Sequence, residues 1–394
     1  MKKKNTLTVC LAVALACAVI AGGGTYAYLQ SETDDVVNSF KANQVTVALE
    51  ETTGNQYDII PGTTQGKDPK VTVKTSVPAF VFVEITDTTQ GLVKYEIADG
   101  WSALTDFGKP VYYRSVDASD EAQSFSVLKD DMVSYDATLA NGDMLGEGGA
   151  LKDGLELSFK AYAIQKYSGT YSNGSYRNFS SADAYVLSNT DKVMEVNSKS
   201  RAITAMKYGK DVILGGDMQT LKLTNSTSNG QNVSIDLNGH TVSPAIMDGA
   251  AVLIENDDAD KPTAITVIGD GTVSGKNSGG IRIAVQCSGA GAYIVLDSGA
   301  YVNENSENSL IYAENGGHIM INGGTFKNND PKWTLNLQDN SGSVIEVRGG
   351  SFFEYDPSNS STEPGGPVSF VADGYKVVSE EKADGTWYTV VPEA

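Results

Sequence analysis

Short apolar runs separated by glycine, proline and asparagine recur along most of this chain. Residues 45–49 alternate apolar and polar positions, and residues 71–74 repeat this period of two. Residues 79–85 form a nearly continuous apolar run, which is typical of a strand buried on both faces. A further alternating strand lies within residues 155–164. The pattern predicts an antiparallel, jelly-roll-like β-sandwich over residues 28–198.

Within this first domain, residues 180–187 are the one stretch whose pattern favours a helix. Pro61-Gly62, Asp99-Gly100 and Asn141-Gly142 are turn signals between the predicted strands. The first half of the chain is therefore expected to be almost entirely β-structure.

From residue 212 onward, short apolar strands recur in three interleaved series. The first series comprises residues 233–237, 265–268, 293–296, 319–321 and 344–347, and the second comprises 221–223, 252–254, 281–285, 310–312 and 335–337. The third contains Val242, Val273, Val302, Phe326 and Phe352. Glycines after the first series, at positions 239, 269, 299, 323 and 349, are spaced by 30, 30, 24 and 26 residues. Three strands per repeat predict a right-handed parallel β-helix over residues 199–394.

Both ends of this coil are expected to be covered. Residues 199–207 can form a short helix over the first coil. Residues 375–378 and 387–391 can form a hairpin over the last one. Such caps shield strand edges that would otherwise template aggregation.

The first 27 residues are typical of a secretory signal peptide. Three lysines precede a 15-residue apolar run, residues 7–21, which is short for a membrane span. We expect cleavage just after Ala27 or Tyr28, and hence an extracellular location. An uncleaved anchor and a lipoprotein modified at Cys17 are the alternatives.

Net charge and cysteine content exclude some classes of partner and an internal disulfide. The formal net charge is −20, and removal of three lysines with the signal peptide makes it about −23. Nucleic acid and anionic membranes are therefore poor partners, and no membrane contact is expected after cleavage. Cleavage leaves Cys287 as the one cysteine, so core packing without an internal disulfide must stabilise the exported chain.

The N-terminal 190 or so residues resemble TasA/camelysin-type secreted fibre proteins. The resemblance is carried, in order, by residues 22–28, 38–50, Pro61-Gly62, Lys67-Asp68-Pro69, 79–85, 111–114 and 161–165. Asn43 stands where the family often has glycine. The resemblance implies export from a Gram-positive bacterium, cleavage by an ER-like signal peptidase, and biofilm-matrix fibres in which an N-terminal segment completes the sheet of the next subunit. Residues 323–326 and 372–375 resemble pectin-lyase-like β-helix modules of bacterial and phage surface proteins.

Candidate chemical sites are few. Four segments superficially resemble the polygalacturonase motif set, namely 189–191, 257–258, 280–283 and 316–318, but the arginine element precedes the histidine element. The camelysin branch has been classed with metallopeptidases, yet this sequence contains no His-Glu-x-x-His. We therefore predict no catalytic residue, no cofactor and no metal site.

Four further features have competing interpretations. The segment from Glu255 to Asp260 could bind a weak extracellular Ca²⁺ or be a solvated turn. His240 and His318 lie three coils apart, too far to share a metal, and His318 should point to solvent. Cys287 is expected at an inward turn position and inert. Residues 167–176, rich in Tyr, Ser, Gly and Asn, could be an adhesive loop or a mobile connection.

These features favour a non-enzymatic, secreted structural protein of the cell surface or biofilm matrix. The segment 29–41, with apolar Val36, Val37 and Phe40 at its end, is the expected donor strand for self-assembly into fibres. The β-helix would then be displayed for adhesion, with a polysaccharide or a host or matrix glycan as a further partner. The alternative is a β-helix carbohydrate-active enzyme, a polysaccharide lyase or hydrolase, carried on an assembly domain.

Overall fold

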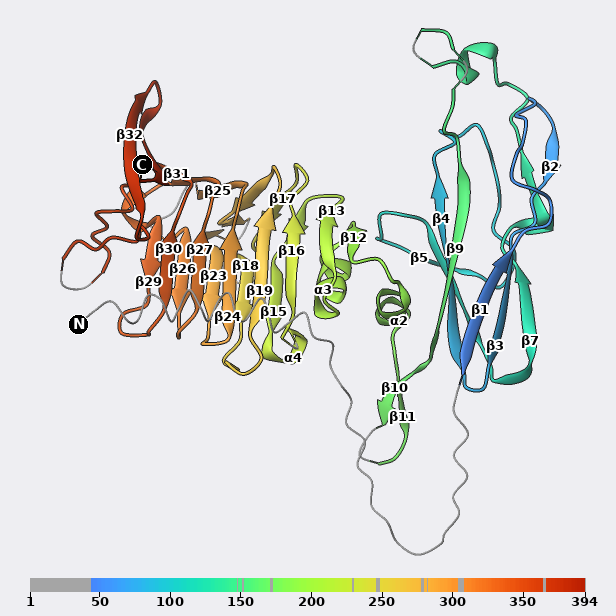
Figure 1. Cartoon of the computed structure of the whole chain (residues 1–394), viewed down its shortest axis with the longest axis horizontal. Helices are drawn as coiled ribbons and strands as arrows, with labels where there is room; N and C mark the ends of the chain where they lie inside the picture. The colour runs from blue at the N-terminus through green and yellow to red at the C-terminus, as the bar shows by residue number, and fades with distance from the viewer. Residues whose placement is uncertain are drawn as a thin grey trace, which may run out of the picture. The chain divides into compact units, whose positions relative to one another are not determined.

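The computed structural model describes residues 44–393, apart from 147, 151, 171–172, 229, 246–248, 278–279, 282, 304–307 and 364–365. The contacts divide the chain into two compact units between Thr190 and Asp191 (Figure 1). The first unit contains antiparallel sheets and the second contains sheets of parallel strands. The all-β class and the order of a sandwich followed by a coil are confirmed.

The first unit is a sandwich of a three-stranded and a four-stranded antiparallel sheet. The three-stranded sheet has the order β1 (Val45–Glu50), β3 (Lys70–Thr75) and β7 (Ser119–Ser126). The four-stranded sheet has the order β5 (Ser102–Leu104), β6 (Val111–Val116), β4 (Ala79–Asp87) and β9 (Leu157–Gln165). Smaller pairs are β2 (Thr64–Gly66) with β8 (Met132–Ser134) and β10 (Tyr167–Thr170) with β11 (Tyr176–Asn178), and 3-10 turns lie at Lys129–Asp131 and Asn141–Met144.

The sandwich core forms where the inward faces of the two sheets meet. Val71 and Val73 of β3 and Val81, Val83 and Ile85 of β4 are fully buried there. Their period of two follows directly from the alternation of side chains along a strand. The predicted strands at 45–49, 71–74 and 79–85 are therefore confirmed.

The first five residues of β4 are apolar on both faces because the outer face of the strand is also covered. Helix α2 (Ser181–Ser188), predicted from the sequence, places Tyr185 against Phe82, with ring centroids 5.5 Å apart. The buried carboxylate of Glu84 accepts hydrogen bonds from the Tyr185 hydroxyl at 2.7 Å and from Asn189 Nδ2 at 3.2 Å. Lys109 Nζ contacts the other oxygen of Glu84 at 2.8 Å. Aromatic packing and a paired buried charge together fix α2 on this sheet.

The second unit is a coil in which three parallel sheets run along its length. The seven-stranded sheet consists of β12 (Val193–Val196), β13 (Asp211–Leu214), β16 (Asn232–Asp236), β19 (Thr263–Ile268), β24 (Ala292–Leu296), β27 (His318–Ile321) and β30 (Val344–Val347). The five-stranded sheet consists of β15 (Leu221–Thr224), β18 (Ala250–Glu255), β23 (Ile283–Ser288), β26 (Ile311–Glu314) and β29 (Leu335–Leu337). These sheets match the first and second series predicted from the sequence.

The third sheet has eight strands and ends in an antiparallel hairpin. Its order is β14 (Met218–Gln219), β17 (Thr241–Ser243), β20 (Thr272–Ser274), β25 (Ala300–Asn303), β28 (Thr325–Asn328), β31 (Ser351–Phe353), β33 (Gly385–Pro392) and β32 (Tyr375–Lys382). The third predicted series needs one correction, because Tyr301 rather than Val302 pairs with Val273 and Phe326. The predicted hairpin is confirmed, and β33 pairs with β31. Short additional elements are the pair β21 (Lys276–Asn277) and β22 (Gly280–Ile281), helix α4 (Asn225–Ser228) and a 3-10 turn at Pro331–Trp333.

The coil begins earlier than the expected boundary at residue 199. Strand β12 already pairs in parallel with β13, so the first strand of the seven-stranded sheet precedes the capping helix. That helix, α3 (Lys199–Lys207), has the predicted bounds and buries Ala202, Ala205 and Met206. The sequence pattern missed β12 because the four residues of this strand precede the periodic part of the chain.

Glycine is required where neighbouring coils approach closely. A Cβ atom on Gly349 would collide with the carbonyl oxygen of Asn322 in the coil beneath, and one on Gly323 would collide with that of Asp297. Because these neighbours are backbone atoms, they cannot move aside cheaply. The glycines that mark the repeat in the sequence therefore have a steric role.

Candidate functional site

The sandwich is open along one side, where the edge strands β1 and β9 lie. Strand β1 ends the three-stranded sheet and β9 ends the four-stranded sheet. The two strands lie beside each other on the same side of the sandwich core. We call this pair of edge strands the β1/β9 seam.

The backbone of β1 directs unpaired hydrogen-bonding groups to the seam. Ser76 N–H donates to the carbonyl of Gln44 at 3.1 Å, and β1 and β3 continue from this pair in a regular antiparallel register. Because bonded and non-bonded pairs alternate in such a ladder, the N–H and C=O groups of Val45, Val47 and Leu49 point away from β3. Within the described residues, no other strand pairs with this edge of β1.

Strand β9 presents the same arrangement. Thr88 N–H donates to the carbonyl of Glu156 at 2.8 Å, and β4 and β9 continue from this pair in a regular antiparallel register. The same alternation turns the backbone groups of Leu157, Phe159 and Ala161 away from β4. A nine-residue edge with exposed hydrogen-bonding groups is a template for pairing with a further strand.

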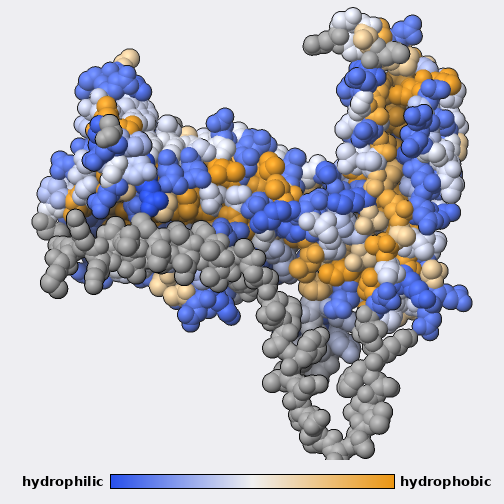
Figure 2. All heavy atoms as spheres, in the orientation of Figure 1, coloured by the Kyte–Doolittle hydropathy of each residue, from blue (hydrophilic) through white to orange (hydrophobic). Residues whose placement is uncertain are grey.

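The side chains at the seam are apolar and incompletely covered. The alternate residues of β1 and β9 that face inward are half-buried, unlike their fully buried counterparts on β3 and β4. They are Val45, Val47, Leu49, Leu157, Phe159, Ala161 and Ala163. Figure 2 shows hydrophobic residues gathered in a band along β9 and toward β1. The seam therefore lacks the cover that a further strand would supply.

At one end, the seam widens into a groove of about 880 Å³, within the size range of ligand sites. We call it the seam groove. Its lining is partly apolar and aromatic and includes Leu49, Tyr57, Leu92, Tyr135, Leu157 and Phe159. Five carboxylates line it as well, against two ammonium groups; they are Glu50, Glu51, Asp58, Asp153 and Glu156, against Lys67 and Lys152. The groove thus combines apolar walls with a net negative charge.

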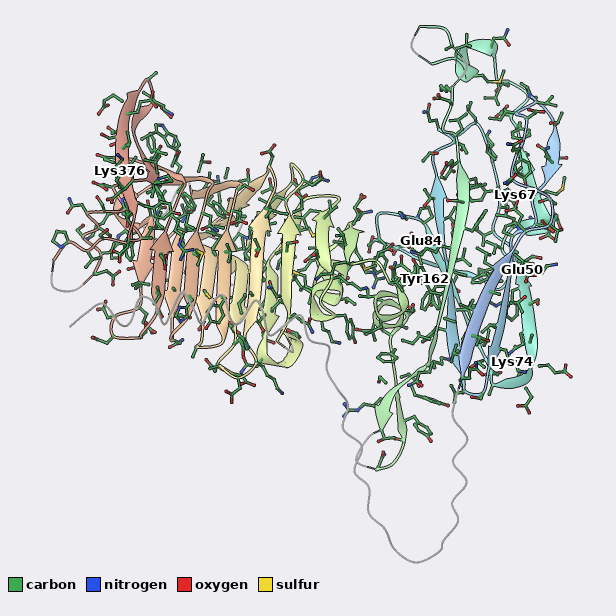
Figure 3. The ribbon with its side chains drawn as sticks, in the orientation of Figure 1. Glu50, Lys67, Lys74, Glu84, Tyr162 and Lys376 are labelled. Atoms are coloured by element: carbon green, nitrogen blue, oxygen red, sulfur yellow. The ribbon has the colours of Figure 1, made fainter. Side chains whose placement is uncertain are left out.

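A nearly buried lysine stands in this groove. Lys67 is 7% exposed, and its Nζ lies 2.8 Å from Glu51 Oε1. The same ammonium lies 4.8 Å from the ring centroid of Tyr57 and 5.5 Å from that of Phe159. Figure 3 labels Lys67 and Glu50, which lie near this end of the seam. Lys67 is stabilised by one carboxylate and two aromatic faces.

The loop that carries Glu51 is tied to the loop that carries Lys67. The carboxylate of Asp68 accepts hydrogen bonds from the N–H and hydroxyl groups of Thr52 and Thr53, at 2.5 to 2.9 Å. These bonds, with that to the Thr52 hydroxyl foremost, hold the pKa of Asp68 well below its usual range. The Tyr57 hydroxyl donates to Glu51 Oε1 at 2.5 Å, which positions that carboxylate for Lys67.

The residues predicted to act in processing and assembly lie outside the described residues. They are Ala27 and Tyr28 at the expected cleavage site and Val36, Val37 and Phe40 in the expected donor segment. The structure thus describes the seam but not the expected donor segment. Sequence reasoning predicted β1 and β9 as strands but missed Tyr57, Lys67 and the groove that they line.

The polygalacturonase-like segments are divided between the two units. Asn189 lies in the sandwich unit, whereas Asp257 and His318 lie in the coil. Arg282 lies outside the described residues. Within the part of the chain that the structure describes, no three His, Cys, Asp or Glu side chains gather as a metal site would require.

The segment from Glu255 to Asp260 forms a turn between two strands of the coil. Asn256 is buried, and its Nδ2 donates to the carbonyl of Lys261 at 2.8 Å and to that of Gly291 at 3.1 Å. Its Oδ1 accepts from Asp258 N–H at 3.0 Å. The side chain of Asn256 therefore organises this turn internally.

The histidines and the cysteine of the coil need two corrections. His318 does not simply point to solvent, because its ring stacks on that of Tyr293 with centroids 5.0 Å apart and is half-buried. This burial lowers the pKa of His318. His240 lies near a carboxylate, with its Nδ1 3.6 Å from Asp217 Oδ1. Cys287 is buried as predicted, but it lies within strand β23 and pairs with Ile254, not at a turn.

The described part of residues 167–176 belongs to a β-hairpin. Strands β10 and β11 pair antiparallel, and the rings of Tyr167 and Tyr176 stack with centroids 4.4 Å apart. Tyr176 remains 62% exposed. The exposed ring of Tyr176, stacked on a half-buried tyrosine, is consistent with the adhesive interpretation.

Comparison with known proteins adds no assignment. No family model matches the chain, and the searches of curated proteins and solved structures found no match. Among the described helices, none is both long enough and apolar enough to cross a bilayer. The function must therefore be inferred from the seam and the coil.

Proposed function

We propose that this protein is a secreted structural subunit of a cell surface or biofilm matrix, which self-assembles by strand donation and displays its β-helix. The observation that carries the proposal is the β1/β9 seam. It combines two strand edges with outward-pointing N–H and C=O groups and a row of half-buried apolar side chains. An extended segment that adds to such an edge satisfies the backbone groups and covers the apolar row at once.

The occupant that we propose is the segment 29–41 of a second copy. Its apolar residues Val36, Val37 and Phe40 can supply the missing cover, and its remaining residues are mostly polar. Donor and acceptor surfaces differ, so a growing assembly always has an unoccupied donor segment at one end and an unoccupied seam at the other. The contact therefore propagates into a fibre. Export through a signal peptide cleaved after Ala27 or Tyr28 would leave the donor segment at the new N-terminus.

Charge should regulate this assembly. Glu32, Asp34 and Asp35 precede the apolar donor residues, and the seam groove is itself net negative. Repulsion between donor and acceptor weakens when salt screens it or when acid protonates the carboxylates. We expect fibres to grow faster at high ionic strength and at acidic pH than at low ionic strength and pH 7.

The test compares chains that begin at Tyr28 and at Lys41, followed by light scattering and electron microscopy across salt and pH. The longer chain should form filaments and the shorter chain should stay monomeric. A synthetic peptide of residues 29–41 should bind the shorter chain, whereas a scrambled peptide should not. If both chains remain equally monomeric under all conditions, strand donation is wrong for this protein.

A matched pair of variants on β9 tests the acceptor. Phe159 is half-buried at the seam, whereas its neighbour Ser158 is exposed on the opposite face. Phe159→Lys should abolish peptide binding and filament formation, because it places a charge in the apolar row. Ser158→Lys should leave both unchanged. Equal behaviour of the two variants would contradict the assignment of the seam as acceptor.

A further inference from the structure

The far end of the coil carries a second groove, formed between the hairpin β32–β33 and the loop that precedes it. Its volume is about 590 Å³. Tyr375, Val377 and Ser379 of β32 and Tyr388 of β33 line one wall. The cross-strand pairing of Ser379 with Tyr388 and the period of two place these residues on one face of the hairpin. We call this the tip groove; Figure 3 labels Lys376, which lies on strand β32 of the same hairpin.

The opposite wall consists of loop residues near Asp356 and Asp373, and hydrogen bonds hold some of them in place. Asp356 Oδ1 accepts from the N–H of Ser358 at 2.9 Å and from its hydroxyl at 2.7 Å. Glu393 N–H donates to the carbonyl of Gly374 at 2.8 Å, which joins the end of the chain to this loop. A wall held in this way is largely preformed, so little ordering entropy is lost when a ligand binds.

The lining suits a neutral saccharide. A tyrosine ring offers an apolar face on which the C–H groups of a sugar ring can pack, and its hydroxyl can hydrogen-bond. Carboxylates and serine hydroxyls around two such rings supply acceptors and donors for sugar hydroxyls. Three carboxylates, Asp356, Asp373 and Glu393, outnumber the single ammonium of Lys376. This net negative charge opposes uronates and other polyanions.

We infer that the tip groove binds a short stretch of a neutral polysaccharide, so that the free end of the coil is the glycan-contacting part of the protein. The inference rests on the part of the proposed function in which the β-helix is displayed. It adds where on the β-helix a ligand binds and which class of ligand it is. It does not depend on strand donation, because the tip groove lies wholly within the coil unit.

The test uses the mature chain with three soluble probes, namely chitotriose, cellotriose and trigalacturonate. Calorimetry and saturation-transfer NMR should show binding of at least one neutral trisaccharide, with saturation transferred to its ring protons, and at least tenfold weaker binding of trigalacturonate. Absence of binding by both neutral probes, or tighter binding of trigalacturonate, would overturn the inference.

Two variants locate the site. Tyr388→Ala removes a ring from the groove, and Asp373→Ala removes an exposed carboxylate of the loop without touching the hairpin core. Each should weaken binding of the neutral probe at least tenfold. Tyr176→Ala, which removes an exposed tyrosine from the sandwich unit, should leave the affinity for the neutral probe unchanged. Full affinity in Asp373→Ala with an unchanged circular dichroism spectrum would contradict the assignment.

Assembly is measured on the same samples, which separates the two proposals. Filaments without saccharide binding would refute the tip groove alone. Saccharide binding by a chain that never assembles would refute strand donation alone.

Discussion

The aromatic rings of Tyr301 and Phe326 stack face to face inside the coil, with centroids 4.8 Å apart and planes inclined by 6°. Phe326 continues this stack onto Phe352 at 4.7 Å. All three side chains are fully buried. The stack runs along the coil axis, one ring per coil, because their strands pair in parallel and in register.

We predict that Phe326→Ala destabilises the coil by about 3–5 kcal/mol, because it removes the middle ring and leaves a cavity that its neighbours cannot fill. Urea unfolding followed by circular dichroism measures the change. Thr325→Ala, which alters the exposed preceding residue of the same strand, should change the free energy of unfolding by less than about 0.5 kcal/mol. A similar effect of both variants would show that the stack contributes nothing specific.

This stack also shows how far the sequence predicts the coil. The three series of strands follow from apolar residues and glycines that recur at a nearly constant spacing. The third series nevertheless contained Val302, because valine matches its neighbours in the series better than tyrosine does. The prediction for Cys287 is wrong for a similar reason, because it places this residue at a turn although strand β23 extends through it. Periodicity determines which residues share a face, but where each short strand starts depends on its pairing with the coil beneath.

The seam could be predicted only in part. The strands at 45–49 and 155–164 are evident from alternation, but their positions at sheet edges depend on pairing with β3 and β4. The seam groove depends further on loops that bring Lys67 beside Glu51, which no local pattern indicates. Local sequence therefore predicts strands, whereas edges and grooves arise from long-range pairing.

A second prediction concerns the buried carboxylate that holds α2 on the sandwich. Glu84→Leu should destabilise the sandwich by about 3–5 kcal/mol, because the Tyr185 hydroxyl and the Asn189 amide lose a buried acceptor. Urea unfolding monitored by tyrosine and tryptophan fluorescence gives the change. The control is Glu96→Leu, which breaks an exposed pair with Lys129 and should cost less than about 1 kcal/mol. Equal costs would mean that the buried network does not hold the helix.

A third prediction concerns the pH dependence of the loop behind the seam groove. Hydrogen bonds from Thr52 and Thr53 depress the pKa of Asp68 below its unfolded value of about 3.9. A depressed carboxyl pKa contributes stability that is complete well above pH 4 and is lost as the pH falls through the folded pKa. Asp68→Asn should therefore be less stable than the natural chain at pH 7, and the difference should shrink as the pH is lowered from about 5 toward 2. A difference independent of pH across this range would contradict the role of the ionised carboxylate.

The last prediction uses Cys287 as a reporter of opening in the coil. Its side chain is fully buried, and Sγ donates to the carbonyl of His318 at 3.4 Å. Burial raises the pKa of this thiol far above its usual range, so the thiolate that reacts with disulfide reagents is scarce in the native state.

In a chain that begins at Tyr28, Ellman's reagent should therefore not react with Cys287 under native conditions. It should react stoichiometrically in urea, with a midpoint that coincides with unfolding of the coil. Thr325→Cys supplies an exposed thiol on strand β28 of the same unit and should react within seconds in the native state. Because the strands of each sheet pair coil by coil, access to Cys287 requires separation of β18, β23 and β26. Rapid labelling of Cys287 in the folded protein would show that the middle of the coil opens without unfolding.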